Sequence, residues 1–129
     1  CLVHGDYKLD NVMYQKDQIV AIFDWEMATL GDPHDDLGWV CTRYYEVDGL
    51  LNGLMEREWF LHRYQELSGR HVNPAAVKFW QVFSNVKMAA ITLTGAQRYV
   101  SGAARKNILA LLPLLMPKLH RDLIELLGW

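Results

Sequence analysis

The chain has 129 residues, of which 51% are hydrophobic and 22% charged, a size and composition typical of one globular domain. Its formal net charge of -2 leaves no basic excess, so we expect no nucleic-acid partner and no anionic membrane surface as partner. The apolar stretch at 108–116 is far shorter than the roughly 20 residues that a bilayer span needs, so we expect no membrane segment.

The two cysteines, Cys1 and Cys41, form no C-x-x-C pair, so neither a disulfide framework nor a zinc site is indicated. A reducing, cytoplasmic location is the simplest expectation, and no secretory signal peptide is visible. The chain starts with an apolar, strand-like Leu2-Val3 and has no initiator Met. We therefore expect residues 1–129 to be an internal fragment that forms a single domain.

The first third of the chain reads as strands and loops. Two short β-prone runs, 12–14 and 19–23, flank four polar residues, which predicts a hairpin. Together with Leu2-Val3 they are expected to form a small strand-rich cradle. Gly and Pro then interrupt regular structure at 31–36, and a helix is expected over about 35–45.

The rest of the chain is predicted to be helical. A helix over 54–67 should stop at Ser68-Gly69, and Asn73-Pro74 supplies an N-cap and a first-turn proline for a long helix over 75–100. Apolar residues ring most of that helix, which predicts a central, buried element. Shorter helices are expected at 106–112 and 117–127. The fold class is therefore α+β, mostly α.

The segment from His4 to Asn11, HGDYKLDN, carries the most specific signal in the sequence. Asp6 and Asn11 have the separation of the Asp and Asn in the protein-kinase catalytic loop, where the Asp accepts the proton of the substrate hydroxyl and the Asn holds magnesium. Gly5 in place of the kinase Arg, Trp25-Glu26 in place of Phe-Gly, and the lack of a downstream A-P-E disfavour a protein kinase.

With the later Asp24-Trp25-Glu26 and the GDPHDDL of residues 31–37, the sequence resembles the aminoglycoside phosphotransferase and choline kinase-like superfamily over residues 1–40. Residues 24–33 are similar to a branch related to acyl-CoA dehydrogenase-associated kinases. The resemblance implies the C-terminal lobe of a protein-kinase-like fold, in which a small β-hairpin carries the catalytic loop and a helical bundle follows. It also implies Mg²⁺-dependent transfer of the γ-phosphoryl group of ATP or GTP to a hydroxyl of a small molecule, with an aminoglycoside as one candidate.

The same resemblance assigns the site residues. Asp6 becomes the catalytic base, and Asn11 and Asp24 become the magnesium ligands, since a hard cation prefers oxygen donors. Taken singly, each of them could equally be a turn residue. Lys8 is expected to contact the nucleotide by neutralising the transferred phosphoryl group, with an exposed loop lysine as the alternative.

Three further residues are expected to support this loop. His4 would fix it through a hydrogen bond, and Gly5 would allow a backbone conformation that other residues resist. Asp36 would brace the loop from the helix that follows, in line with the resemblance. Its alternative role is that of a carboxylate favoured by the dipole at a helix start.

The parts of such a kinase that cradle the nucleotide precede the catalytic loop, and only three residues precede His4. We expect the N-terminal lobe to be absent and residues 1–129 alone to be inactive, with a homodimer favoured by the apolar surface left uncovered. A non-catalytic, pseudokinase-like binding module is the alternative. Residues 1–48 hold ten acids against three bases, which would suit a polycationic acceptor, although metal binding explains the same acids.

Overall fold

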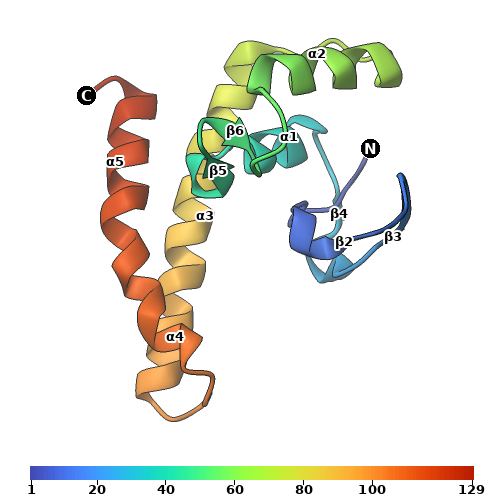
Figure 1. The fold of residues 1–129 in the computed structure, drawn as a ribbon. Coiled ribbons are helices and arrows are strands. Elements are labelled where there is room, and N and C mark those ends of the chain that lie inside the picture. The colour runs from blue at the N-terminus through green and yellow to red at the C-terminus, as the bar shows by residue number, and fades with distance from the viewer. The chain divides into compact units, whose positions relative to one another are not determined.

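The computed structural model describes all residues, 1–129, and divides into two compact units, Cys1–Gln81 and Val82–Trp129. Figure 1 shows that strands occur only in the first unit and that the chain beyond residue 81 is helical. The long helix α3, Pro74–Val100, contributes residues to both units. None of the helices combines the length and apolar character that crossing a bilayer requires. The expectation of a single domain stays a prediction.

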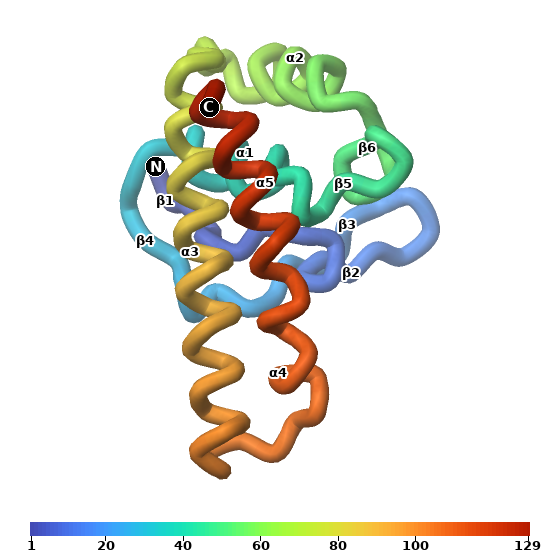
Figure 2. The backbone as a smooth tube through the Cα atoms, turned by 90° about the vertical axis from the view of Figure 1, so that its left-hand side faces the viewer, coloured from blue at the N-terminus to red at the C-terminus, as the bar shows by residue number.

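Three small antiparallel sheets, each of two strands, form the β part of the first unit. The pairs are β1 (Leu2–Val3) with β4 (Thr29–Leu30), β2 (Val12–Gln15) with β3 (Gln18–Ile22), and β5 (Glu46–Val47) with β6 (Leu50–Leu51). β2 and β3 confirm the expected hairpin, which turns at Lys16-Asp17 with Lys16 at a φ of 54°. Figure 2 shows this hairpin as an extended loop of the tube.

Leu2-Val3, expected to form a small strand-rich cradle with the hairpin, is a strand whose partner lies further along the chain. β1 does not join the hairpin but pairs with β4, and the backbone of Cys1 and Gly31 extends this pairing at 2.9 Å. The loop between β3 and β4 therefore begins beside His4, whose Nε2 lies 2.7 Å from the Phe23 carbonyl oxygen, and ends beside Val3. As a result, the segment from His4 to Asn11 meets the segment that carries Asp24, although His4 and Phe23 are 19 positions apart.

The helix expected over 35–45 is shorter, since α1 covers His34–Val40. It ends because Thr42 adopts an extended backbone, with ψ of 139°, and its hydroxyl donates to the Trp39 carbonyl at 2.9 Å. A 3-10 turn and the unexpected β5–β6 hairpin follow. α2 begins at Arg57 rather than at residue 54, because Met55 still forms a β-bridge with Leu51. It ends at Ser68, as expected, and Gly69 after it has a left-handed backbone conformation.

The loop before α1 is tied to the start of α3 by a chain of hydrogen bonds. Asp32 Oδ1 accepts the His34 backbone N–H at 2.9 Å, and Asp32 Oδ2 accepts the Trp80 indole N–H at 3.3 Å. The His34 Nε2 atom accepts the backbone N–H of Asn73 at 3.0 Å, so its proton sits on Nδ1, which donates to Asp32. These bonds fix where α1 begins.

α3 starts as expected, because Asn73 Oδ1 accepts the Ala75 N–H at 2.9 Å. The expectation that its apolar ring is buried is wrong. Phe79 is 61% exposed, whereas Val77 and the polar Gln81 are buried. Gly38 of α1 faces this part of α3, and a Cβ there would lie 2.5 Å from Trp80 Cβ. The helices meet through a small residue rather than through large apolar side chains.

The core of the first unit gathers side chains from α1, β6 and the segment around the start of α3. Its buried members are Leu37, Val40, Cys41, Leu51, Val72 and Val77. Tyr7, in the loop between β1 and β2, and the α2 residues Phe60 and Tyr64 pack against it, half-buried. The core thus reaches the loop and holds α1, whose first turn carries Asp36.

The second unit contains the later turns of α3, α4 (Ile108–Leu111), a 3-10 turn at Leu112–Leu115 and α5 (Met116–Leu127). α5 confirms the expected last helix, whereas the helix expected over 106–112 is reduced to α4. Figure 2 shows α4 beside the C-terminal end of α3. This approach depends on Gly95, where a Cβ would lie 2.7 Å from Leu112 Cδ1.

Candidate active site

The loop that follows β1 turns sharply at Gly5. Gly5 has a φ of +80°, and a Cβ at this position would lie 2.6 Å from the carbonyl oxygen of Met27. Both the backbone conformation and the space therefore require glycine. The Gly5 backbone consequently lies directly against the turn that follows Asp24.

Asp36, in the first turn of α1, holds the same loop from another side. Its Oδ2 accepts the backbone N–H of His4 at 2.7 Å and its Oδ1 accepts that of Gly5 at 2.8 Å. Two amides of an irregular segment are thereby satisfied by one charged acceptor, which gives short and strong hydrogen bonds. The negative charge also lies at the N-terminal end of α1, where the helix dipole favours it.

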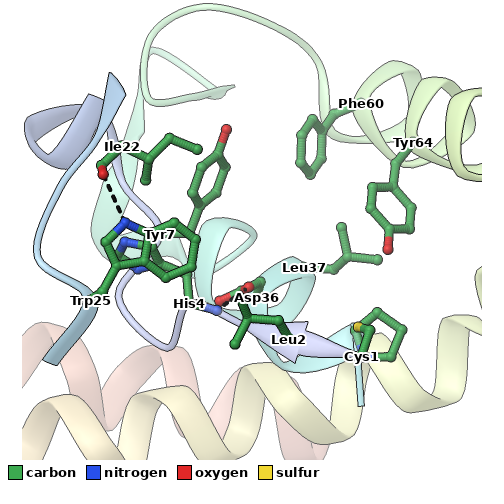
Figure 3. Close-up of a pocket in the computed structure, with 11 residues that line it drawn as sticks. Cys1, Leu2, His4, Tyr7, Ile22, Trp25, Asp36, Leu37, Phe60 and Tyr64 are labelled. Carbon is green, nitrogen blue, oxygen red and sulfur yellow. Dashed lines mark hydrogen bonds between the residues drawn. The ribbon is translucent and has the colours of Figure 1, made fainter. Parts of the chain in front are cut away.

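The imidazole of His4, 3% exposed, connects the two motif segments. Its Nδ1 accepts the backbone N–H of Asp6 at 3.2 Å, so its Nε2 carries the proton and donates to the Phe23 carbonyl at 2.7 Å. A ring with one accepting and one donating nitrogen is neutral. The Trp25 ring lies against it, with centroids 4.6 Å apart, and Figure 3 shows the two rings together above Asp36.

Asp6 lies at the centre of a small polar cluster, with its side chain 14% exposed. Its Oδ2 accepts from Lys8 Nζ at 2.8 Å and from Asn11 Nδ2 at 3.1 Å. The same Asn11 nitrogen also donates to the Asp6 carbonyl at 2.9 Å, which fixes the orientation of the amide. Asp6 Oδ1 and Asn11 Oδ1 make no hydrogen bond within the chain and remain as acceptors.

Asp24 follows β3 directly. The Phe23 N–H donates to the Asn11 carbonyl at 2.7 Å, which brings the end of β3 to the end of the loop between β1 and β2. The backbone of Asp24 adopts the left-handed helical conformation, with φ of 64° and ψ of 52°, which is uncommon for a residue other than glycine. Its carboxylate is exposed and accepts no hydrogen bond from the chain.

The structure therefore places the expected residues in two linked groups. Asp6, Lys8 and Asn11 are in direct contact. Asp24 comes directly after Phe23, whose backbone N–H donates to the Asn11 carbonyl. His4, Gly5 and Asp36 form the hydrogen-bonded base of the loop. The sequence did not single out Trp25 or the Phe23 carbonyl as contacts of His4, although the aromatic residue beside Asp24 was a visible signal.

The donor set fits magnesium, which takes few protein oxygens and completes its shell with water and phosphate oxygens. Asn11 Oδ1 and the Asp24 carboxylate are oxygen donors without partners in the chain. No group of three His, Cys, Asp or Glu side chains that could hold a metal occurs in residues 1–129. A cation at this site would thus be held by the Asn11 amide oxygen and the Asp24 carboxylate, with water and phosphate oxygens as its other ligands.

Tyrosine hydroxyls lie within electrostatic range of these carboxylates. Burial, followed by the negative charge of Asp6, raises the pKa of Tyr45 above its ordinary value. Burial, followed by the charge of Asp36, raises the pKa of Tyr7. Both hydroxyls therefore stay protonated at neutral pH and can donate hydrogen bonds. Tyr45 lies in the 3-10 turn Arg43–Tyr45 after α1 rather than in the helix expected over 35–45.

A cavity of about 300 Å³ lies on one side of the loop and is lined mainly by apolar side chains. Figure 3 shows its wall of His4, Tyr7 and Trp25 with Phe60 and Tyr64 of α2 across the space. The lining includes neither Asp6, Asn11 nor Asp24. The cavity is therefore distinct from the polar cluster.

Comparison with known proteins identifies relatives of this arrangement. The sequence model of the phosphotransferase enzyme family matches residues 1–80. A solved structure from Ralstonia eutropha, provisionally assigned as an aminoglycoside phosphotransferase, superposes with a TM-score of 0.78 at 25% identity and covers 97% of this chain and 41% of its own. This likeness agrees with the mostly helical α+β fold.

Curated relatives are much longer proteins. A probable acyl-CoA dehydrogenase, IBR3 of Arabidopsis thaliana, is 31% identical over 80% of this chain and 14% of its own length. The mouse acyl-CoA dehydrogenase family member 11 is 30% identical over 79% of this chain and 15% of its own length. Family member 10 of mouse is 48% identical over 34% of the chain. The chain thus spans about a seventh of the first two relatives.

The family match covers both motif segments, from His4 to Asn11 and from Asp24 to the first turn of α1, and the fold agrees with a solved protein assigned to the same activity class. The contacts between these segments are those that hold the loop in the structure. The chain belongs to the phosphotransferase enzyme family.

Proposed function

We propose that the protein carrying this chain transfers the γ-phosphoryl group of ATP or GTP to a hydroxyl of a small molecule in a magnesium-dependent reaction. The observation that carries the proposal is the environment of Asp6. One carboxylate oxygen is held by Lys8 and Asn11, and the other is left as an acceptor. A carboxylate fixed in this way is suited to orient an attacking hydroxyl and to accept its proton.

Phosphoryl transfer needs positioning and charge neutralisation more than covalent chemistry, so the neighbouring residues take these roles. Asn11 Oδ1 and the Asp24 carboxylate would hold the cation. When bound, Mg²⁺ neutralises charge on the phosphate oxygens. The contact between the Phe23 amide and the Asn11 carbonyl supports this pairing, because it keeps the two ligand-bearing segments together.

Lys8 would supply the remaining positive charge. Its Nζ lies 2.8 Å from Asp6, beside the place where the acceptor hydroxyl would bind, and its side chain is 25% exposed. From there a flexible ammonium group reaches oxygens of an incoming phosphoryl group. We therefore assign Lys8 to the nucleotide. His4, Gly5 and Asp36 would act only by holding the loop.

The acceptor belongs to the proposal only as a class, an alcohol on a small molecule. An aminoglycoside is one candidate, supported by the assignment of the Ralstonia eutropha protein and by the acidic first third of the chain. The curated relatives carry acyl-CoA dehydrogenase names, but the matched part is a small share of those proteins. Their names therefore do not identify the acceptor here.

The test uses the full-length protein with MgATP or MgGTP and a panel of small alcohols that includes aminoglycosides. Product phosphorylation is measured by mass spectrometry. Asp6→Asn should abolish transfer but keep Mg²⁺-dependent nucleotide binding, whereas Asp24→Asn should weaken that binding. Asp17→Asn, in the exposed hairpin turn, is the matched control and should leave both unchanged.

A wild-type transfer rate in Asp6→Asn would refute the proposed role of the carboxylate. Mg²⁺-dependent nucleotide binding without product, in the wild type and with every acceptor, would instead favour a non-catalytic, pseudokinase-like module. We further propose that residues 1–129 alone are inactive, because they include no glycine-rich nucleotide loop.

A further inference from the structure

Trp25 has no role in the chemistry proposed above, yet it makes a specific contact. Its ring lies 4.6 Å from that of His4, and its indole N–H donates to the Ile22 carbonyl at 2.7 Å. The indole is 45% exposed, whereas the imidazole beneath it is 3% exposed. Trp25 therefore acts as a cover for His4 rather than as a member of the buried core.

His4 is contacted by both neighbours of Asp24. The Phe23 carbonyl accepts the Nε2 proton and the Trp25 ring packs on the imidazole. The opposite nitrogen of the same ring, Nδ1, accepts the backbone N–H of Asp6. One imidazole thus joins the residue proposed as the base to the segment that carries the proposed metal ligand.

The backbone at Asp24 makes this connection necessary. A left-handed conformation at a residue other than glycine is strained, so it persists only where the flanking residues are fixed. The Phe23 amide is fixed by Asn11, and the Trp25 side chain is fixed by Ile22 and His4. If the indole is lost, the residue that follows Asp24 is no longer held by Ile22 and His4, and the His4 ring becomes more exposed to solvent.

We infer that Trp25 is a positioning residue that, by locking the His4 ring in one orientation, sets the placement of Asp6 relative to Asp24. The inference rests on the proposed phosphoryl transfer for its kinetic consequence. Its structural part, the locking of His4, does not depend on that reaction. The two parts are therefore tested by separate measurements on the same variants.

The structural part is tested by the reactivity of His4 toward diethyl pyrocarbonate in the full-length protein, mapped by mass spectrometry. This reagent acylates an accessible, unprotonated imidazole nitrogen. In the wild type His4 should be protected relative to His62, whose side chain is 70% exposed. Trp25→Leu should raise His4 modification severalfold. Trp25→Phe, which keeps a ring but loses the N–H, should restore most of the protection.

The kinetic part is tested with MgATP and the acceptor found in the alcohol panel. Trp25→Leu should lower kcat by about 10- to 100-fold, as small displacements of reacting groups do, and leave KM for MgATP within about twofold. Trp25→Phe should recover most of kcat. Trp129→Leu, the same change at an indole that is 86% exposed, should alter neither kcat nor His4 reactivity.

Wild-type protection of His4 in folded Trp25→Leu would overturn the inference, whatever the activity. Raised His4 reactivity with unchanged kcat would overturn it as well, because the lock would then not set the geometry. If the wild type itself forms no phosphorylated product, the proposed function fails, while the reactivity of His4 still decides whether Trp25 locks the ring. A melting temperature near that of the wild type confirms that each variant is folded.

Discussion

The carboxylate of Asp36 lies 2.7 Å from the backbone nitrogen of His4, a residue 32 positions earlier in the chain. Its second oxygen accepts the Gly5 amide at 2.8 Å. A single side chain of α1 thus satisfies two consecutive amides of the loop that leads to Asp6.

Replacement of Asp36 should destabilise the first unit. Asp36→Ala leaves two amides without their acceptors and should lower the free energy of unfolding by about 2 to 4 kcal/mol. Asp36→Asn keeps one acceptor oxygen and should cost about half as much. Urea denaturation followed by tryptophan fluorescence measures both. If Asp36→Ala were as stable as Asp17→Ala in the exposed hairpin turn, the bracing contact would not matter.

Glycine at position 5 should be required for two separate reasons, and the chain offers a control that separates them. Gly49 has nearly the same φ, +79°, but a Cβ there meets nothing within 4 Å. Gly49→Ala should therefore lower the free energy of unfolding by only about 1 kcal/mol, the cost of a left-handed backbone conformation at alanine. Gly5→Ala adds the clash with the Met27 carbonyl and should cost about 3 kcal/mol. Equal losses of unfolding free energy in the two variants would contradict the close approach.

Cys41 should make stability fall in alkaline solution. Burial raises the pKa of its thiol from 9.0 to about 11. Below pH 9 the thiol is protonated in both states, so its contribution is fully present. Between pH 9 and 11 only the unfolded chain loses the proton, and the contribution of about 2 to 3 kcal/mol is lost.

Cys41→Ala removes this dependence. The difference in unfolding free energy between wild type and variant, from urea denaturation, should therefore shrink as the pH rises through that window. The two tyrosines with raised pKa titrate in both proteins and cancel. A constant difference from pH 8 to the alkaline limit would show that the folded protein exposes the thiol.

Lys8→Met should separate stability from activity. The Lys8–Asp6 pair is partly exposed and worth at most about 1 kcal/mol, so the melting temperature should change little. If Lys8 contacts the nucleotide as proposed, phosphoryl transfer should fall by about 100-fold, the scale of a lost charge-stabilising group. Lys78→Met, at an exposed position on α3, is the control. Normal transfer by Lys8→Met would leave Lys8 as an ordinary loop lysine.

Features that depend on neighbouring residues were predictable from the sequence. The β2–β3 hairpin follows from two β-prone runs around a polar turn, and the start of α3 follows from the Asn73 cap. The β5–β6 hairpin was missed, although Asp48-Gly49 between its strands is a typical turn pair. Its strands have only two residues each, too few to show an alternating pattern.

Features that depend on contacts between distant segments were not predictable. The spacing of Asp6 and Asn11 marked both residues as candidates. It did not predict that one Asn11 nitrogen donates hydrogen bonds to two oxygens of Asp6. The sequence likewise did not indicate that His4 donates a hydrogen bond to the Phe23 carbonyl. It also did not indicate that Phe79 of α3 is exposed, because apolar periodicity does not tell which other element packs against a helix face. The functions assigned to these residues stay predictions.

The negative charge of Asp6 is paired with the ammonium group of Lys8, and the amide of Asn11 donates a hydrogen bond to the same oxygen. The carboxylate is thus held by side chains of its own loop. A group that is already held loses little conformational freedom in a complex, so in the proposed transfer more of the binding free energy would be available for holding the reactants in line.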